Sequence, residues 1–275
     1  MLKSQFYLLF KRKEFKLSLL VMTLISVGYF IFKCIYYFGY DITSVLSAKY
    51  LYIGSRYSGA ISYFIELLIP FIVAIPFSDS LFEERKRKTI QFCLSRTTIT
   101  KYYFSKLLVV FVGGILIVLI PFLINIILNA ITFPADSSFT AHNLSIHNSY
   151  TFETLIKTIL FKDLFADNMN LYNLLYLIIF STTSGLFSVI TYQISLFYKK
   201  SRIFLLVFFY GVYIFSMAAA SALGYNSYHI STYLFASDFY NNQTSSGMIF
   251  SFTVLFLSAL LPIPFSKRKL VDLYD

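Results

Sequence analysis

The residues best suited to chemistry in this sequence are a pair of adjacent glutamates. Glu83 and Glu84 stand directly before the basic run Arg85 to Lys88. Paired carboxylates of this kind help to activate water or hold a metal when histidines complete the site. The positions of the histidines therefore decide whether a catalytic interpretation is open.

The three histidines do not support such a site. His142, His147 and His229 all lie between apolar runs and have no carboxylates at helical spacing, so we interpret them as solvated loop residues. Because no apolar run contains a histidine, an intramembrane protease built on Glu83 and Glu84 would lack its ligand set. None of the ten glycines is followed by lysine, which excludes a Walker-type ATP site. The sequence predicts no catalytic residue, no bound metal and no cofactor in this chain.

Two charged residues lie inside apolar runs, where charge is costly and by default suggests function. Lys33 is about five residues and Glu66 about six residues from the expected outer end of its run, which places both at a depth of roughly 8–9 Å. One interpretation is a structural ion pair, or a lysine that extends to the surface. The other is a polar patch that lines a translocation path.

The composition indicates the elements that must position these residues. The 275 residues are 57% hydrophobic and only 13% charged, whereas an ordinary soluble domain carries about 25% charged residues. The mean hydropathy is +0.70. The chain is rich in Phe, Tyr, Ile, Lys and Asn, which is typical of an AT-rich bacterial genome. We therefore expect one all-α membrane domain over residues 1–275, in a bacterial cytoplasmic membrane.

Six apolar runs have about the length that a bilayer core of roughly 30 Å requires. They cover residues 17–38, 60–77, 107–133, 171–198, 203–223 and 248–265. The second and sixth are short and carry two prolines each, which predicts kinks or broken helices. No small-residue cleavage site follows the first run, which predicts a retained anchor and not a signal peptide.

The basic residues alternate between the connections, as six membrane crossings require. Of the 23 lysines and arginines, 18 fall before the first run, after the last, or in the connections after the second and fourth. Both termini are therefore predicted to be cytoplasmic. This crowding of the +10 net charge into short loops is a membrane-orientation pattern and does not indicate nucleic-acid binding.

Several smaller elements follow from local patterns. Leu2, Phe6, Leu9 and Phe10 recur at helical spacing, which predicts an N-terminal helix in the membrane interface that leads like an elbow into the first span. The extracellular loop 134–170 is too long for a simple turn and is expected to hold a short surface helix. After Thr151, a candidate N-cap, the apolar residues that repeat at helical spacing are Phe152, Leu155, Ile156, Ile159 and Leu160. Small and hydroxyl residues at 181–185 and 216–222 favour close helix packing, with a substrate path as the secondary interpretation.

The cytoplasmic segment 79–106 carries the most specific pattern in the chain. It reads Phe82-Glu83-Glu84-Arg85-Lys86-Arg87-Lys88-Thr89 and continues through Leu94-Ser95-Arg96 to Lys106 before the third span. This pattern resembles the membrane subunits of type-two ABC exporters. In that family a glutamate follows the second span, then come a Gly-Thr pair, a Leu-Leu-Ser stretch and a lysine before the third span. Here Lys88 replaces the glycine, and a proline that is frequent after the serine is missing.

The resemblance implies a partner and a mechanism. It implies an ATPase-coupling interface that includes Glu83, Glu84, Arg85, Arg87, Thr89, Leu94, Ser95 and Arg96. ATP and Mg²⁺ would bind to a separate ABC ATPase subunit, whose closure pushes a coupling helix and moves the spans beside it. Six spans are half a transporter, so the resemblance also implies a second permease copy or a paralogue. Antimicrobial or amphipathic peptides are the cargo that such stand-alone permeases suggest, and lipid-linked glycans and drugs stay open.

Two other function classes stay open at this point. A self-contained secondary transporter or channel would need no ATPase. A membrane-embedded enzyme would need turnover that depends on the loop histidines or on Glu66. An ATPase that co-purifies with the chain separates the exporter from both alternatives.

Overall fold

The computed structural model describes residues 2–55, 58–76, 80, 84, 97–135, 160–197, 202–236 and 243–265. Within these ranges every regular element is a helix and no β-strand occurs. The helices in chain order are α1 (Leu2–Lys11), α2 (Lys13–Tyr36), η1 (Ile42–Ser44), α3 (Ala48–Leu51), α4 (Ala60–Ala74), α7 (Ile99–Thr132), α10 (Lys162–Asp167), α11 (Met169–Phe197), α12 (Arg202–Ala222), η3 (Asn226–Tyr228), η4 (Ile230–Tyr233) and α13 (Ser245–Leu260). The prediction of an all-helical chain is confirmed for the described residues.

Four of the helices are long and apolar enough to cross a membrane, namely α2, α7, α11 and the segment Ser245–Phe265 that contains α13. The chain is therefore a multi-pass, all-helical membrane protein by helix length and composition. The second and fifth predicted spans also coincide with helices, α4 and α12. Their apolar parts, Ile61–Ala74 and Val207–Ala222, are shorter. At 1.5 Å per residue the 15 residues of α4 extend only about 23 Å.

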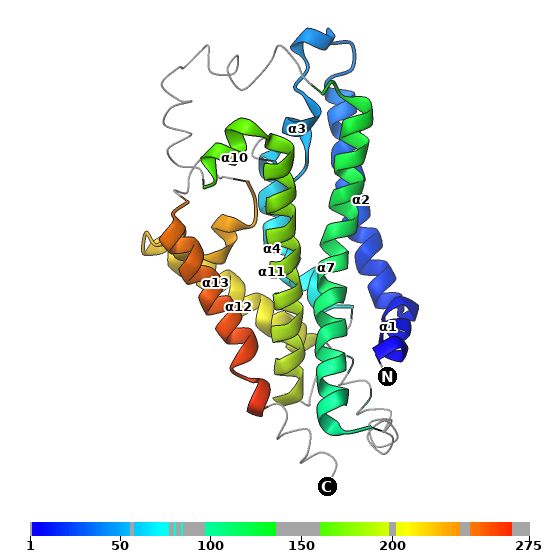
Figure 1. Cartoon of the computed structure of the whole chain (residues 1–275), viewed down its shortest axis with the longest axis vertical. Coiled ribbons are helices and arrows are strands. Elements are labelled where there is room, and N and C mark those ends of the chain that lie inside the picture. Colours follow the sequence, from blue (N-terminus) through cyan, green and yellow to red (C-terminus); the bar gives the residue numbers. More distant parts are fainter. Residues whose placement is uncertain are drawn as a thin grey trace.

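The four long helices run in two opposite directions along the bundle (Figure 1). Helices α2 and α7 run away from the end that holds α1, whereas α11 and α13 run back toward it. We call these two ends the α1 end and the α3 end. Helix α11 lies at the centre, in contact with α4, α7, α12 and α13. It is the most buried candidate span, with 72% of its most apolar stretch inside the protein.

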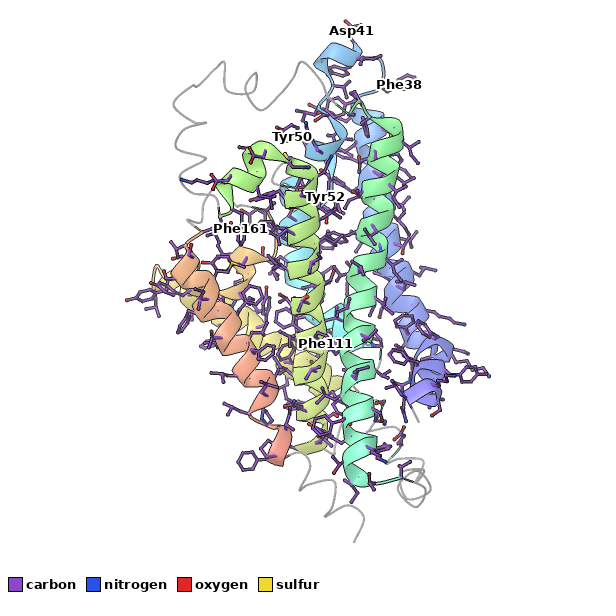
Figure 2. All side chains as sticks on the ribbon, viewed as in Figure 1. Phe38, Asp41, Tyr50, Tyr52, Phe111 and Phe161 are labelled. Carbon is purple, nitrogen blue, oxygen red and sulfur yellow. The ribbon has the colours of Figure 1, made fainter. Side chains whose placement is uncertain are left out.

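Helices α7 and α11 form the most extensive contact and approach each other at two glycines. A Cβ atom added to Gly114 would lie 2.8 Å from the carbonyl oxygen of Ser184 and 3.0 Å from the Cα of Gly185. A Cβ on Gly185 would lie 2.8 Å from the ring of Phe111, at the crossing of the two helices (Figure 2). This close approach agrees with the packing interpretation of the small residues at 181–185.

The hydroxyl groups of that small-residue cluster are turned mostly inward to their own helix. Ser181, Thr183 and Ser184 donate to carbonyl oxygens four residues earlier, at 2.7–2.9 Å. Such bonds satisfy a hydroxyl in an apolar environment without a partner from outside the helix. The second small-residue cluster differs, because its members Ser216 and Ala218 on α12 are exposed in the single chain.

A buried asparagine joins three elements at the α3 end. The Asn125 side chain on α7 donates to the carbonyl oxygen of Ser26 on α2 at 2.9 Å and accepts from the backbone amide of Ile53 at 2.9 Å. Ser26 donates in turn to the carbonyl oxygen of Pro121 at 2.7 Å. Since Asn125 and Ser26 are both 0% exposed, these bonds fix the register of α2 on α7 in a medium that offers no competing water.

The N-terminal helix α1 meets α2 at the predicted elbow and packs against other helices of the bundle. Arg12 is extended between α1 and α2 and donates to the carbonyl oxygen of Pro76, just beyond α4, at 3.3 Å. Helix α1 packs against α7, where the buried Leu9 lies over Gly113. The face of α1 that carries Leu2, Phe6, Leu9 and Phe10 therefore packs partly against the rest of the protein.

Of the prolines in the short spans, Pro70 is accommodated inside a helix, whereas Pro76 and Pro262 lie just beyond helix ends. Pro70 lies inside α4, whereas the helix ends at Ala74, before Pro76. Helix α13 ends at Leu260 and is followed by a turn at Pro262.

In the predicted extracellular loop the structure describes residues 134–135 and 160–170, which include α10. Apart from Leu160, the surface helix that the sequence predicts after Thr151 lies outside the described residues.

Candidate functional site

A short ion pair joins Glu84 of the predicted coupling segment to α7. Lys106 Nζ on α7 lies 2.6 Å from Glu84 Oε2. The Lys106 side chain is 0% exposed and that of Glu84 is 17% exposed. A charge buried this completely is costly unless it is paired and hydrogen-bonded, so the pair fixes the position of Glu84 against the first turns of α7.

Neighbouring side chains complete this cluster. The Tyr102 hydroxyl donates to the same carboxylate oxygen of Glu84, and the Lys106 ammonium lies 5.1 Å from the centre of the Tyr102 ring. Ser80 Oγ lies 3.4 Å from Lys106 Nζ. Tyr102 and Lys106 are four residues apart, so the helix stacks them on one face. We call Ser80, Glu84, Tyr102 and Lys106 the anchor cluster.

The helical boundary here differs from the sequence prediction. The predicted span began at residue 107, but α7 begins at Ile99, after Thr98 in extended conformation. Residues 101–106, which we assigned to the connecting segment, are therefore helical. The 34 residues of α7 extend about 51 Å, well beyond a bilayer core of roughly 30 Å. The excess length agrees with a helix that projects out of the membrane at the α1 end.

Most of the predicted interface residues cannot be compared with the structure. Glu84 is described, whereas Glu83, Arg85, Arg87, Thr89, Leu94, Ser95 and Arg96 lie outside the described residues. Lys106 formed part of the sequence pattern but was not among the predicted site residues. The four-residue spacing of Tyr102 and Lys106 was the signal that could have identified Lys106 as a buried residue. Residues at this spacing lie on one face of a helix and share its environment.

The two intramembrane charges have separate surroundings. Lys33 on α2 lies 5.3 Å from the centre of the Tyr29 ring, one turn earlier on the same helix. Glu66 on α4 is 7% exposed and lies close enough to Tyr213 on α12 to interact with it electrostatically. No ion pair joins Lys33 to Glu66 in the described part of the chain.

Comparison with known proteins gives no relative from which a role could be transferred. Neither the protein-family models, nor the curated proteins, nor the solved structures contain a match to this chain. The site must therefore be interpreted from its own residues. Within the described residues, no group of three or more His, Cys, Asp or Glu side chains is placed to hold a metal ion.

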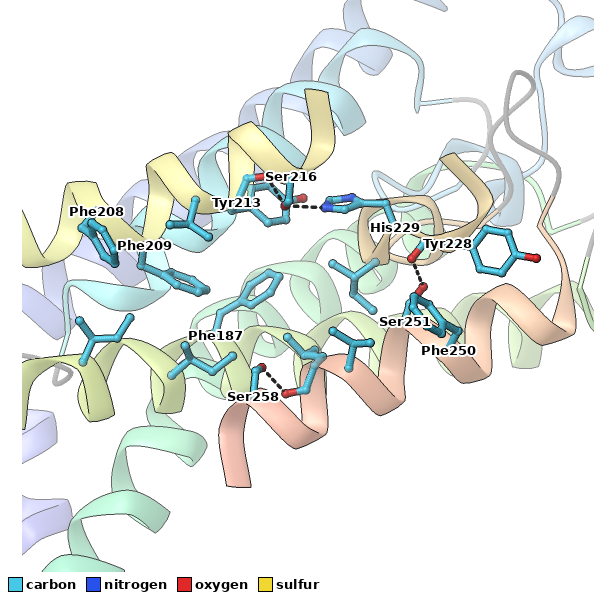
Figure 3. A pocket seen from close by; sticks show the side chains of 16 residues that line it. Phe187, Phe208, Phe209, Tyr213, Ser216, Tyr228, His229, Phe250, Ser251 and Ser258 are labelled. Atoms are coloured by element: carbon cyan, nitrogen blue, oxygen red, sulfur yellow. Dashed lines mark hydrogen bonds between the residues drawn. The ribbon is translucent and has the colours of Figure 1, made fainter. Parts of the chain in front are cut away.

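The prediction that all three histidines are solvated loop residues is wrong for His229. This residue lies between η3 and η4 and lines a cavity among α11, α12 and α13 (Figure 3). Its Nε2 lies 3.0 Å from Ser216 Oγ on α12, and its Nδ1 lies 2.8 Å from Ser231 Oγ. The sequence placed this residue in a loop but could not show that the loop folds back onto α12. His142 and His147 lie outside the described residues.

The hydrogen bonds around His229 require a neutral ring. Ser216 donates to the carbonyl oxygen of Tyr213 at 2.8 Å, so its oxygen is available to accept from Nε2–H. The backbone amide of Ser231 donates to Nδ1 at 3.3 Å. We assign the Nε2–H tautomer from this network. Burial of the ring lowers the pKa of His229 from 6.5 to about 4, because the charged form loses hydration.

This lowered pKa predicts how stability depends on pH. In the unfolded chain His229 binds a proton near its usual pKa of 6.5, whereas in the folded chain the pKa is about 4. The folded protein should therefore lose stability as pH falls from about 6.5 to about 4 and be insensitive to this group at higher pH. Because the ring is partly exposed, we expect the free energy of unfolding to fall by less than about 1.4 kcal/mol per pH unit. Thermal unfolding in mild detergent as a function of pH measures this loss.

A His229→Gln variant is the matched control for this effect, since glutamine keeps a donor toward Ser216 and does not titrate. Its unfolding midpoint should fall less steeply with acidification than that of the native chain. The contribution of His142 and His147 to the slope is common to both proteins. Equal slopes in the two proteins would contradict the assignment.

Proposed function

We propose that this chain is the permease subunit of an ATP-driven ABC exporter and that a separate ATPase subunit docks on the segment around Glu84. The observation that carries the proposal is the anchor cluster. A coupling segment must be attached firmly to a membrane helix if movement of an ATPase is to move that helix. The 2.6 Å pair between buried Lys106 and Glu84 supplies such an attachment.

The packing of α7 supports its role as the moving element. Helix α7 carries the anchor cluster in its first turns and contacts α1, α2, α4 and α11 further along. A push on the segment at Glu84 would therefore act on a helix that packs directly against the central helix α11. The closely packed α7–α11 contact would transmit this displacement and would not absorb it, because packed interiors deform little.

The distribution of charge supports a cytoplasmic position for the anchor cluster. Basic residues gather at the α1 end, where the described set includes Lys3, Lys11, Arg12, Lys13, Lys16 and Lys101. The α3 end carries Lys49 and Lys162 in the described residues. Lysine and arginine favour the cytoplasmic side of a membrane protein. On this proposal both termini and the segment 79–106 face the cytoplasm of a bacterium, and six helices cross its membrane.

The proposal includes partners that this chain does not contain. ATP and Mg²⁺ would bind to the ATPase subunit, while two permease copies, identical or paralogous, would form the path. Antimicrobial or amphipathic peptides are the proposed cargo, since the phenylalanine- and tyrosine-rich spans offer apolar and hydrogen-bonding surface together.

Co-purification of an ATPase from native membranes tests this proposal. The chain is extracted in mild detergent, and the ATPase bound per permease is quantified for the native chain and for Glu83→Lys and Glu83→Lys/Glu84→Lys variants. Reversal of charge at a docking surface costs several kcal/mol, so bound ATPase should fall by about tenfold or more. The single variant leaves the anchor cluster intact, which separates loss of docking from loss of fold.

An Asp41→Lys variant is the control, because Asp41 is exposed beyond α2 at the α3 end (Figure 2). It should retain the ATPase at the native level. If purified chain free of any ATPase transports cargo at the full rate, the exporter proposal is wrong.

One observation favours a second candidate, a secondary transporter that needs no ATPase. Glu66 is buried on α4 inside the apolar part of the bundle, and buried membrane carboxylates commonly take part in proton relays. On that alternative, Glu66→Gln should abolish uptake driven by a proton gradient in vesicles that contain only this chain.

A further inference from the structure

A cavity of about 350 Å³ separates α12 from α13. Its floor is formed by α11 through Phe187, Ile190 and Ile194. Helices α12 and α13 both pack against α11, with Phe208 and Phe209 on one wall and Ser251 and Ser258 on the other (Figure 3). The connection that contains η3 and η4 closes one end. No residue of the anchor cluster lines this cavity, so binding of a ligand here does not depend on the proposed function.

The side of the cavity away from α11 is bordered by residues that face outward. Phe208 and Val212 on α12 and Phe250 and Val254 on α13 line the cavity and are each about half exposed. Exposed apolar side chains on membrane helices contact lipid. The cavity therefore borders the hydrocarbon region, and an apolar molecule could enter it sideways without crossing water.

The closed end of the cavity is polar. There the neutral ring of His229 is bonded to Ser216, and the Tyr213 ring lies 5.5 Å from the His229 ring between centres. The Tyr213 side chain is 4% exposed, and its hydroxyl has no hydrogen-bond partner among the described residues. A buried hydroxyl without a partner is costly, which indicates a position for a polar group that enters from the cavity.

The charges near this end select against an anionic group. His229 is neutral at physiological pH and so offers no compensating positive charge. Glu66 lies near Tyr213, and its carboxylate would repel an anion bound at that hydroxyl. An uncharged head group that donates and accepts hydrogen bonds suits the site.

We propose that this cavity binds a single-chain amphiphile with an uncharged hydrogen-bonding head, of the monoacylglycerol class. The alkyl chain lies between α12 and α13, and the head contacts Tyr213, Ser216 and His229. The volume supports one chain and not two, because about 350 Å³ is near the lower limit of ligand pockets, which span roughly 300–1,000 Å³. A membrane lipid and an exported amphiphile share this chemistry.

Tryptophan fluorescence tests the proposal directly, because the native chain contains no tryptophan. Phe209→Trp places the reporter in the cavity wall, and Phe215→Trp places it on the same helix at a position that is 76% exposed. Each full-length variant is reconstituted in phosphatidylcholine vesicles and titrated with a monoacylglycerol brominated in its chain. The cavity reporter should be quenched saturably, at a mole fraction at least about fivefold lower than the lipid-facing reporter.

Two cavity-filling changes keep the test decisive. Ser258→Phe, or Val254→Phe if the first does not fold, should remove the preferential quenching of the Phe209→Trp reporter. Three outcomes would overturn the proposal: equal quenching of both reporters, preference that survives both filling changes, or equally tight saturable quenching by a brominated two-chain phosphatidylcholine.

The head group is tested in a separate arm with a brominated fatty acid at alkaline pH, where its carboxyl group is ionised. The ionised acid should show no saturable preference for the cavity, and His229→Leu should weaken binding of the monoacylglycerol about fivefold. Binding of the ionised acid as tight as that of the neutral probe would contradict the proposed selectivity. The same probe distinguishes cargo from lipid. If monoacylglycerol leaves the vesicles only when ATP and an ATPase are present, the occupant is cargo. If the molecule stays bound to the chain in native membranes, the occupant is a membrane lipid.

Discussion

Replacing Gly114 by leucine is expected to prevent stable packing of α7 on α11. The first added carbon would already lie 2.8 Å from the carbonyl oxygen of Ser184, and backbone atoms cannot rotate away as a side chain can. Overpacking usually costs about 1–3 kcal/mol, and we expect at least the upper end of that range here because both helices would have to separate. The unfolding midpoint in mild detergent and the monodisperse fraction after extraction measure the loss.

Gly211→Leu is the matched control for this prediction. Gly211 lies on α12, and no atom lies within 4 Å of a Cβ built on it. This variant should be at least as stable as the native chain, since leucine favours a helix by up to about 1 kcal/mol relative to glycine. If Gly114→Leu were as stable as Gly211→Leu, the close α7–α11 crossing would not exist in the membrane.

The second large effect concerns the anchor cluster. Glu84→Gln should lower the free energy of unfolding by about 3 kcal/mol, because it leaves the ammonium of Lys106 buried without its carboxylate. Lys106→Met should cost only about 1 kcal/mol, since Glu84 is 17% exposed and is able to turn toward water. Denaturant titration in mild detergent compares the two variants.

The two substitutions should nevertheless act alike on coupling. On the exporter proposal, each breaks the attachment of Glu84 to α7, so ATP hydrolysis by the ATPase partner should no longer respond to this chain in either variant. A Lys106→Met protein that folds normally and still stimulates its ATPase would separate the ion pair from coupling. Equal destabilisation by Glu84→Gln and Lys106→Met would contradict the buried position of the lysine.

The positions of the long helices could be predicted from the sequence, because each apolar run carries its own information. All six predicted spans coincide with helices, with α7 and α11 within a few residues of their predicted C-terminal ends. Helix α7 begins eight residues before the membrane span that was predicted for it. Polar residues such as Lys101 and Tyr102 continue a helix as readily as apolar ones, so hydropathy marks the membrane and not the helix.

The contacts between distant segments could not be predicted in this way. Glu84 and Tyr102 lie against the buried Lys106, and the loop that carries His229 returns to Ser216 on α12. Asn125 likewise bonds to Ser26, 99 residues earlier in the chain. Each of these contacts depends on how the helices pack. Local sequence patterns do not show which distant segments come into contact.

The anchor cluster and the cavity suggest different tasks for the two sides of the bundle. Helix α7 holds the attachment of the predicted coupling segment, whereas α12 and α13 border the cavity. The central helix α11 touches both groups through α7 on one side and α12 and α13 on the other. On the exporter proposal, movement that starts at Glu84 would reach the cavity through α11.

The proposal that this chain is half of an ATP-driven transporter is tested most directly by the mass of the complex that it forms in native membranes. Native mass spectrometry of the chain extracted in mild detergent should show two permease subunits, at least one of them this 31.8 kDa chain, bound to two copies of an ATPase. The Glu83→Lys variant should lose the ATPase and keep the permease pair. A chain that is present only without an ATPase, and that transports cargo in this form, would contradict the account.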